Sequence, residues 1–189
     1  DSVVDVGMAV RLSQLGALGV LNLEGIQTRY AEVKPILDRI TSVGKDEFVP
    51  LMQEIYAEPI KPDLIAQRIQ EIKQLDGIAA VSATPAGSSK YGTVVAKAGA
   101  DLFFVQATVV STAHLSPESV VPLDLAQFCR EMPIPVVLGN CVTYEVALNL
   151  MKAGAAAVLV GIGPGAACTS RGVLGVGVPQ ATAIADCAA

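Results

Sequence analysis

A three-part pattern recurs along the chain: the end of a helical segment, then a glycine, then a short apolar run. The central glycines are Gly16, Gly99 and Gly154, and the apolar runs cover residues 18–23, 102–105 and 158–160. Because glycine readily takes the left-handed conformation that ends a helix, each copy predicts a helix followed by a strand. The runs are apolar throughout, which is typical of parallel strands that helices cover on both faces.

Two further apolar runs, residues 78–83 and 135–139, fit the same scheme as strands. Helical spacing of apolar residues predicts helices over residues 5–15, 62–75, 88–98, 122–131 and 143–153. Strands and helices that alternate about every 25–30 residues indicate an α/β protein, and periodicity alone leaves a barrel and a doubly wound sheet both open. Residues 27–59 are irregular and contain Pro35, Pro50 and Pro59, which we expect to break this stretch, although an elaborated helical connection would also explain it.

Composition and charge exclude several classes of protein. Of the 189 residues 52% are hydrophobic and 16% are charged, which is enough apolar material for a core and too little charge for disorder. The net charge of −5, without a cluster of Lys and Arg, argues against binding a nucleic-acid polymer. A single nucleotide stays open, because backbone N–H groups can hold its phosphate. No apolar run approaches the roughly 18 residues of a membrane span, so no membrane partner is expected.

The cysteines and the histidine indicate neither zinc nor disulfides. The four cysteines are widely spaced and His114 is the only histidine. We therefore expect a cytoplasmic protein with reduced thiols. Cys129 and Cys187 fall in helical patterns and are expected to pack there, and packing is also favoured for Cys141.

In both α/β architectures, functional sites form where the parallel strands end. The loop after the last predicted strand has three glycines in five residues, at positions 161, 163 and 165, followed by Cys168 and Arg171. Glycines let the backbone approach a ligand, N–H groups can hold an anion and carbonyls can hold a cation. Cys168 is a candidate nucleophile, with nearby N–H dipoles and Arg171 favouring its thiolate; the alternative is a small buried side chain.

Polar residues follow two other strands. Asn140 ends the strand at residues 135–139, where its amide would face the mouth of a barrel. Gln106, Thr108, Ser111 and His114 follow the strand at residues 102–105. We expect His114 to be a surface or hydrogen-bonding residue rather than a base.

The glycine-rich loop carries a family resemblance. Residues 161–171 read G-I-G-P-G-A-A-C-T-S-R and residues 175–180 read G-V-G-V-P-Q, which together resemble the catalytic cysteine loop of IMP dehydrogenases and GMP reductases. Residues 139–143 resemble the end of another strand in that family. Residues 1–21 resemble the family's early helix and the strand that follows it. The resemblance implies a (β/α)₈ TIM barrel, usually assembled as a homotetramer. Residues 1–189 would be one incomplete catalytic domain with about five strands, lacking N- and C-terminal parts of the barrel.

The resemblance also implies the chemistry. Cys168 would attack C2 of a purine nucleoside monophosphate while hydride moves between C2 and NAD or NADP, and Ser170 would assist the water or leaving-group step. Substrate would be held by Asn140, Gly165, Ala166 and Cys168, and cofactor by Gln106, Thr108, Gly161 and Gly163. Carbonyls of Gly163, Gly165 and Cys168 would hold a monovalent cation such as K⁺ (potassium).

The chain departs from the family pattern at four points. Ser170 and Ala166 stand where the family usually has Thr and Ser, Gln106 stands where it usually has Asp, and the tandem regulatory module is absent. The family's later strands and its flap with an arginine base would lie beyond Ala189, so we expect this chain alone to be inactive.

Four readings of the function follow. Residues 176–186 favour an IMP dehydrogenase that oxidises IMP to XMP with NAD. The missing module favours the alternative, a GMP reductase that converts GMP and NADPH to IMP and ammonia. Gln106 and Ala166 would also suit a non-catalytic, nucleotide-binding paralogue, and a purely structural fragment is the fourth reading.

Overall fold

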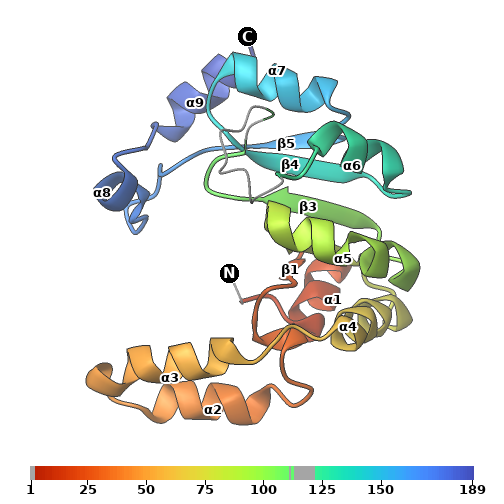
Figure 1. Ribbon diagram of the computed structural model, residues 1–189, viewed down its shortest axis with the longest axis vertical. Coiled ribbons are helices and arrows are strands. Elements are labelled where there is room, and N and C mark those ends of the chain that lie inside the picture. Colours follow the sequence, from red (N-terminus) through yellow and green to blue (C-terminus); the bar gives the residue numbers. More distant parts are fainter. Residues whose placement is uncertain (1–2, 111, 113–121) are drawn as a thin grey trace. The chain divides into compact units, whose positions relative to one another are not determined.

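The computed structural model describes residues 3–110, 112 and 122–189, in two compact units. One unit is Asp1–Ser82 with Thr93–Asp101, and the other is Ala83–Gly92 with Leu102–Ala189. The first contains α1 (Val6–Gln14), β1 (Val20–Asn22), the short 3-10 helix η1 (Ile26–Thr28), α2 (Lys34–Ser42), α3 (Lys45–Ala57), α4 (Pro62–Gln74) and β2 (Ala80–Ala83). The second contains β3 (Leu102–Gln106), α6 (Leu125–Glu131), β4 (Val136–Cys141), α7 (Tyr144–Lys152), β5 (Ala157–Val160), α8 (Ser170–Leu174) and α9 (Gln180–Cys187). The helix α5 (Pro85–Ala98) contributes residues to both units (Figure 1), and the last residue of β2, Ala83, belongs to the second.

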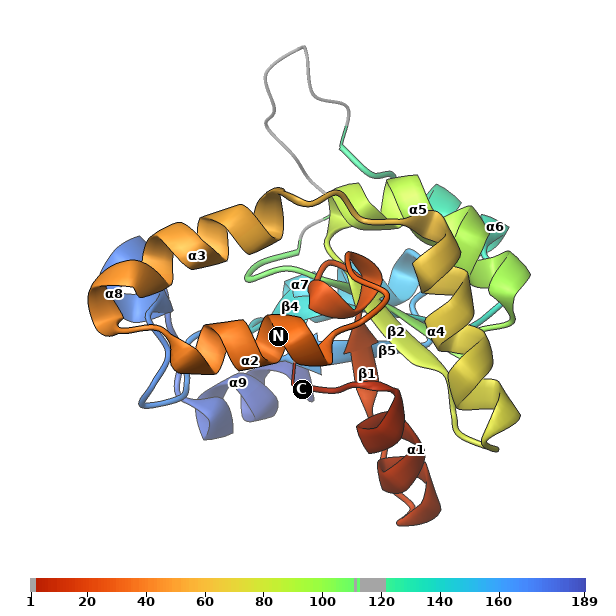
Figure 2. The same ribbon diagram turned by 90° about the horizontal axis from the view of Figure 1, so that it is seen from below.

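The first unit is built on a parallel pair of strands. Leu21 of β1 is in register with Val81 of β2, and both are fully buried. The helices α1 and α4 pack against each other beside these strands (Figure 2). Asp5 begins α1 by accepting the N–H of Met8 at 2.7 Å, as an N-cap residue does.

The irregular stretch between residues 27 and 59 forms a helical hairpin. The helices α2 and α3 run side by side (Figures 1 and 2), which confirms the helical connection. Pro35 lies in the first turn of α2, where its missing N–H costs little. The expectation that Pro50 breaks the chain is wrong, because α3 continues through it. Burial of Leu51 and Ile55 in a cluster with Ile26 and Ile36 offsets the penalty of about 3 kcal/mol for an internal proline.

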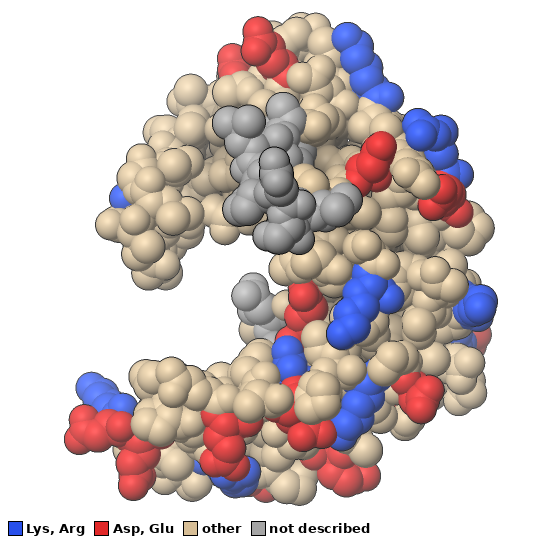
Figure 3. All heavy atoms as spheres, in the orientation of Figure 1, with Lys and Arg blue, Asp and Glu red and all other residues tan. Residues whose placement is uncertain are grey.

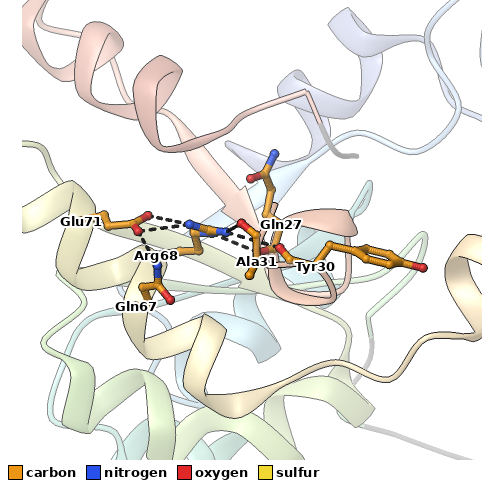
Figure 4. Close-up of polar contacts among 6 residues, drawn as sticks. All are labelled: Gln27, Tyr30, Ala31, Gln67, Arg68 and Glu71. Atoms are coloured by element: carbon orange, nitrogen blue, oxygen red, sulfur yellow. Dashed lines mark hydrogen bonds and ion pairs between the residues drawn. The ribbon is translucent and has the colours of Figure 1, made fainter. Parts of the chain in front are cut away.

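A buried arginine joins this connection to α4 (Figure 4). The Arg68 side chain donates to the carbonyl oxygens of Gln27 at 3.1 Å and Ala31 at 2.7 Å, and it forms an ion pair with Glu71. Arg29 similarly donates to backbone carbonyls of Glu24, Tyr56 and Glu58. The loops around η1 are thus held by guanidinium groups that satisfy several carbonyls at once.

The second unit contains a parallel ladder of three strands. Val105 of β3 is in register with Leu138 of β4, which is in register with Val158 of β5. The helix α7 packs against β4, β5 and α9. Phe128 of α6 lies 5.6 Å from Phe103 of β3, measured between ring centroids. The carboxyl ends of the three strands therefore lie at one edge, where the sequence places its candidate site.

All five predicted strands are present, and the three glycines of the recurring pattern have φ values of 76°, 83° and 103°. Two helix boundaries differ from prediction. The helix α6 begins at Leu125 rather than residue 122, because the Asp124 carboxylate accepts the N–H of Gln127 and caps it there. The helix α5 begins at Pro85, one turn earlier than predicted, since proline suits a first turn.

Charged side chains of both signs are interspersed on the face drawn in Figure 3. On α2 they pair, for example Lys34 with Asp38 at 3.1 Å. In the part of the chain that the structure describes, no helix has the length and hydropathy that crossing a bilayer requires.

Candidate active site

The candidate site is the loop that leaves β5 and leads into α8 (Figure 1). Gly161 and Gly163 have φ values of 133° and 63°, which other residues rarely adopt. A Cβ at Gly161 would lie 2.5 Å from Oε1 of Gln180. Gln180 in turn donates from Nε2 to the carbonyl of Val160 at 2.9 Å. The start of the loop is therefore held by a side chain that needs a glycine beside it.

Asn140 connects this loop to the neighbouring strand ends. Its Nδ2 donates to the carbonyl of Gly161 at 2.9 Å. Its backbone N–H donates to the carbonyl of Ala107 at 3.0 Å, and Ala107 donates to Gly139 at 2.9 Å. The carboxyl ends of β3, β4 and β5 are thus tied together, and the amide is used to position the loop's backbone.

The two residues of β3 and its following loop that are predicted to hold the cofactor lie at the same edge of the strands. Gln106 is the last residue of β3, in register with Gly139, and its side chain is exposed. Thr108 is exposed two residues later. An amide and a hydroxyl in these positions can hydrogen-bond a carboxamide or a ribose, so they fit a nicotinamide cofactor without a charged partner. Ser111 and His114 lie outside the described residues.

Cys168 is half-buried in the loop, and its neighbours favour the thiolate. Its Sγ lies 3.3 Å from Oγ of Ser170, and its backbone N–H donates to Gly165 at 3.1 Å. Hydrogen bonds with the Ser170 hydroxyl and with its backbone lower the pKa of the Cys168 thiol, and the charge of Arg171 adds to this. A thiol with a lowered pKa and partial exposure is the form in which cysteine acts as a nucleophile.

The remaining cysteines have different surroundings. Cys141 is buried, and burial together with the adjacent Cys187 thiol raises its pKa to about 11. Burial also raises the pKa of Cys129. The prediction that Cys141 packs in the interior is therefore confirmed, and Cys168 alone among these three has a lowered thiol pKa.

The residues expected to hold a monovalent cation do not fit one as they are arranged. The carbonyl of Gly163 accepts a hydrogen bond from Nη1 of Arg171 at 2.7 Å, and the carbonyl of Gly165 accepts the N–H of Cys168. A guanidinium already stands at the first carbonyl, where a second cation would be repelled. Ala166 is exposed and offers only backbone groups to a phosphate.

From the sequence, Arg171 was expected to act only on the Cys168 thiolate, and Gln180 was given no contact. The glycines in the sequence could have indicated both contacts, because Gly161 lies against the Gln180 side chain and Gly163 and Gly177 lie against that of Arg171.

The family model for the IMP dehydrogenase/GMP reductase domain matches residues 1–189. The chain belongs to the IMP dehydrogenase/GMP reductase family. Members with curated names include an uncharacterized oxidoreductase of Mycobacterium leprae, 39% identical over 195 residues, and one of Mycolicibacterium smegmatis, 36% identical over 195 residues. Each match covers 100% of this chain and 52% of the relative, so the chain spans about half the length of these proteins.

A named enzyme and a crystal structure are also similar to this chain. The inosine-5'-monophosphate dehydrogenase of Pasteurella multocida is 44% identical over 110 residues, which are 58% of this chain and 21% of that enzyme. The crystal structure of an IMP dehydrogenase/GMP reductase-like protein from Corynebacterium glutamicum superposes with a TM-score of 0.87 at 30% identity, covering 100% of this chain and 49% of that one. The prediction of an α/β chain forming part of a TIM barrel is thereby confirmed.

Proposed function

We propose that the protein containing this chain oxidises or reduces a purine nucleoside monophosphate at C2 through a covalent bond to Cys168. The observation that carries the proposal is the Cys168 thiol, which lies 3.3 Å from the Ser170 hydroxyl with a lowered pKa, in a loop that follows a parallel strand. Membership in a family of oxidoreductases supports it. On this proposal residues 1–189 belong to one catalytic barrel.

In the dehydrogenase reaction, the Cys168 thiolate would donate its electron pair to C2 of IMP and form an S–C2 bond, while the π electrons of the ring C–N double bond at C2 move onto the nitrogen. The hydrogen on C2 would then leave as hydride and restore the ring C–N double bond; a nicotinamide cofactor, which Gln106 and Thr108 would hold, would supply the hydride acceptor. Water subsequently adds to C2, the S–C2 bond breaks, and XMP is released with the thiol restored. Splitting the reaction in this way lets a soft nucleophile make C2 tetrahedral before hydride leaves.

The remaining residues position these groups. Asn140 holds the carbonyl of Gly161, and backbone N–H groups of the glycine-rich loop, at Gly165 and Ala166, would bind the phosphate. Ser170 keeps its hydroxyl beside the sulfur, where it can pass a proton to or from the attacking water. Gln106 and Thr108 would bind NAD or NADP through uncharged hydrogen bonds.

IMP dehydrogenase is the leading assignment, because the named enzyme among the relatives cited is an IMP dehydrogenase. GMP reductase is the second candidate, since only η1, α2, α3 and α4 separate β1 from β2 and no regulatory module lies between them. In that reaction Cys168 would displace ammonia from C2 of GMP, and NADPH, held by the same residues, would supply the hydride that replaces sulfur to give IMP. A homotetramer in the cytoplasm, with reduced thiols, belongs to the same proposal.

Absorbance at 340 nm with the full-length protein separates the candidates. IMP with NAD should raise the absorbance if the protein is a dehydrogenase, and GMP with NADPH should lower it if the protein is a reductase. Cys168→Ala should abolish either signal, whereas the matched variant Cys129→Ala should retain it. Turnover that survives Cys168→Ala would refute the covalent mechanism, and the absence of turnover with both pairs would favour a nucleotide-binding paralogue.

A further inference from the structure

Arg171 is exposed to solvent and reaches back to the glycine-rich loop. Its Nη1 donates a hydrogen bond at 2.7 Å to the carbonyl of Gly163, which lies eight residues earlier in the chain. This is the carbonyl that the family resemblance assigns to a monovalent cation. A guanidinium carries the same unit charge as such a cation and holds it permanently, because arginine does not lose its proton in proteins.

The stem of Arg171 runs through a slot that two glycines keep open. A Cβ at Gly177 would lie 2.4 Å from Cγ and 2.9 Å from Cδ of Arg171. A Cβ at Gly163 would lie 3.4 Å from the same Cγ and 2.9 Å from the carbonyl oxygen of Val176. The backbone on both sides of the slot is joined by a hydrogen bond from Val178 to Ile162 at 2.9 Å. The slot is therefore matched to this side chain.

From these contacts we propose that the Arg171 guanidinium serves as the internal cation of the loop, taking the place of a bound monovalent ion at the Gly163 carbonyl. Arg171 is then a positioning residue: it holds the conformation of the loop that carries Cys168, in addition to the direct effect of its charge on the thiol. This inference rests on the proposed function only in taking the loop to be part of a purine site. The role of Arg171 in holding the loop's conformation does not depend on that function. The proposal predicts that the protein works without potassium.

The test uses the full-length protein in 100 mM KCl and in 100 mM choline chloride, about equal in ionic strength. The first readout is the rate at which iodoacetamide alkylates Cys168 at fixed pH, with mass spectrometry of the peptides to separate the four cysteines. The second readout is the melting temperature, and the third is kcat and KM with whichever nucleotide is turned over. We expect the wild-type values to be the same in both salts.

The variants Arg171→Met and Arg171→Lys separate charge from packing. Arg171→Met keeps much of the stem and removes the charge, so alkylation of Cys168 should slow at least severalfold in choline chloride and recover in part in KCl. Arg171→Lys should retain most of the wild-type rate in both salts, because an ammonium can replace the guanidinium as a cation. Arg130→Met, which removes an exposed arginine from α6, is the matched control and should behave as wild type.

Two results would overturn the assignment. One is a wild-type protein whose alkylation rate or melting temperature depends on K⁺ as strongly as that of Arg171→Met. The other is an Arg171→Met variant that matches wild type in choline chloride. Because alkylation and melting need no turnover, these results are distinguishable from a failure of the proposed purine chemistry, which Cys168→Ala tests separately.

Discussion

Cys168 and Cys141 lie in the same unit, yet their surroundings shift their thiol pKa values in opposite directions. Hydrogen bonds with Ser170 lower the pKa of Cys168 in an accessible loop, whereas Cys141 is buried at the end of β4 and its pKa rises. The difference comes from which protonation state each environment stabilises: hydrogen-bond donors favour the thiolate and an apolar interior favours the neutral thiol.

The first prediction concerns Ser170. Replacing it by alanine removes a hydroxyl hydrogen bond to the sulfur, so the pKa of Cys168 should rise toward its ordinary value. Less thiolate is then present at pH 7, and alkylation of Cys168 at that pH should slow severalfold. The pH dependence of the alkylation rate measures this, and Ser170→Thr, which keeps a hydroxyl, is the control. An unchanged pH profile for Ser170→Ala would show that the hydroxyl does not act on the thiol.

The second prediction concerns alkaline stability. Cys141 keeps its proton in the folded protein up to about pH 11, while in the unfolded chain it ionises near pH 9. Its contribution to the free energy of unfolding is thus fully present below pH 9 and is lost as the pH rises through 11. Cys141→Ala should flatten the fall in stability between pH 9 and 11, as followed by denaturant unfolding. Cys168→Ala should not flatten it, because the thiol pKa of Cys168 is shifted downward.

At the scale of elements, guanidinium groups decide how the connections are held. Arg68 of α4 reaches a carbonyl within η1 and another just after it, and Arg171 of α8 reaches the loop after β5. In each case one side chain supplies the hydrogen-bond donors that the carbonyl groups of an irregular segment do not find in the backbone. A helix can position a loop in this way without any strand contact.

The third prediction tests the first of these contacts. Arg68→Met leaves the carbonyls of Gln27 and Ala31 without their donor, which should cost about 2–4 kcal/mol of unfolding free energy. Denaturant unfolding measures this loss, and Arg68→Lys should recover only part of it, because an ammonium lacks the planar fork. Glu71→Gln, which keeps Arg68 and its carbonyl contacts, should cost less. A full loss in Glu71→Gln would mean that the ion pair, and not the carbonyl contacts, stabilises this region.

For the whole molecule, the relevant fact is that the chain covers about half of its curated relatives. The fourth prediction is that residues 1–189 expressed alone show no turnover with IMP and NAD or with GMP and NADPH, while the full-length protein shows one of the two. The reason is that a barrel closes its core and completes its mouth only with all of its strands. The 340 nm assay on both proteins checks this, and turnover by the 189-residue segment would contradict it.

The helix ends, the strands and the candidate loop depend on local sequence, so the sequence alone was enough to predict them. Gly16, Gly99 and Gly154 mark helix ends because their backbone conformation depends on the residue itself, and the apolar runs after them become strands. The candidate loop was likewise visible, because three glycines and a cysteine after a strand form a contiguous pattern. Only the tertiary structure decided the rest. Pro50 stays within a helix because distant residues bury its neighbours, and Asn140 and Arg171 hold carbonyls 21 and eight positions away. Contacts of this kind depend on how the elements pack, which the pattern along the chain does not record.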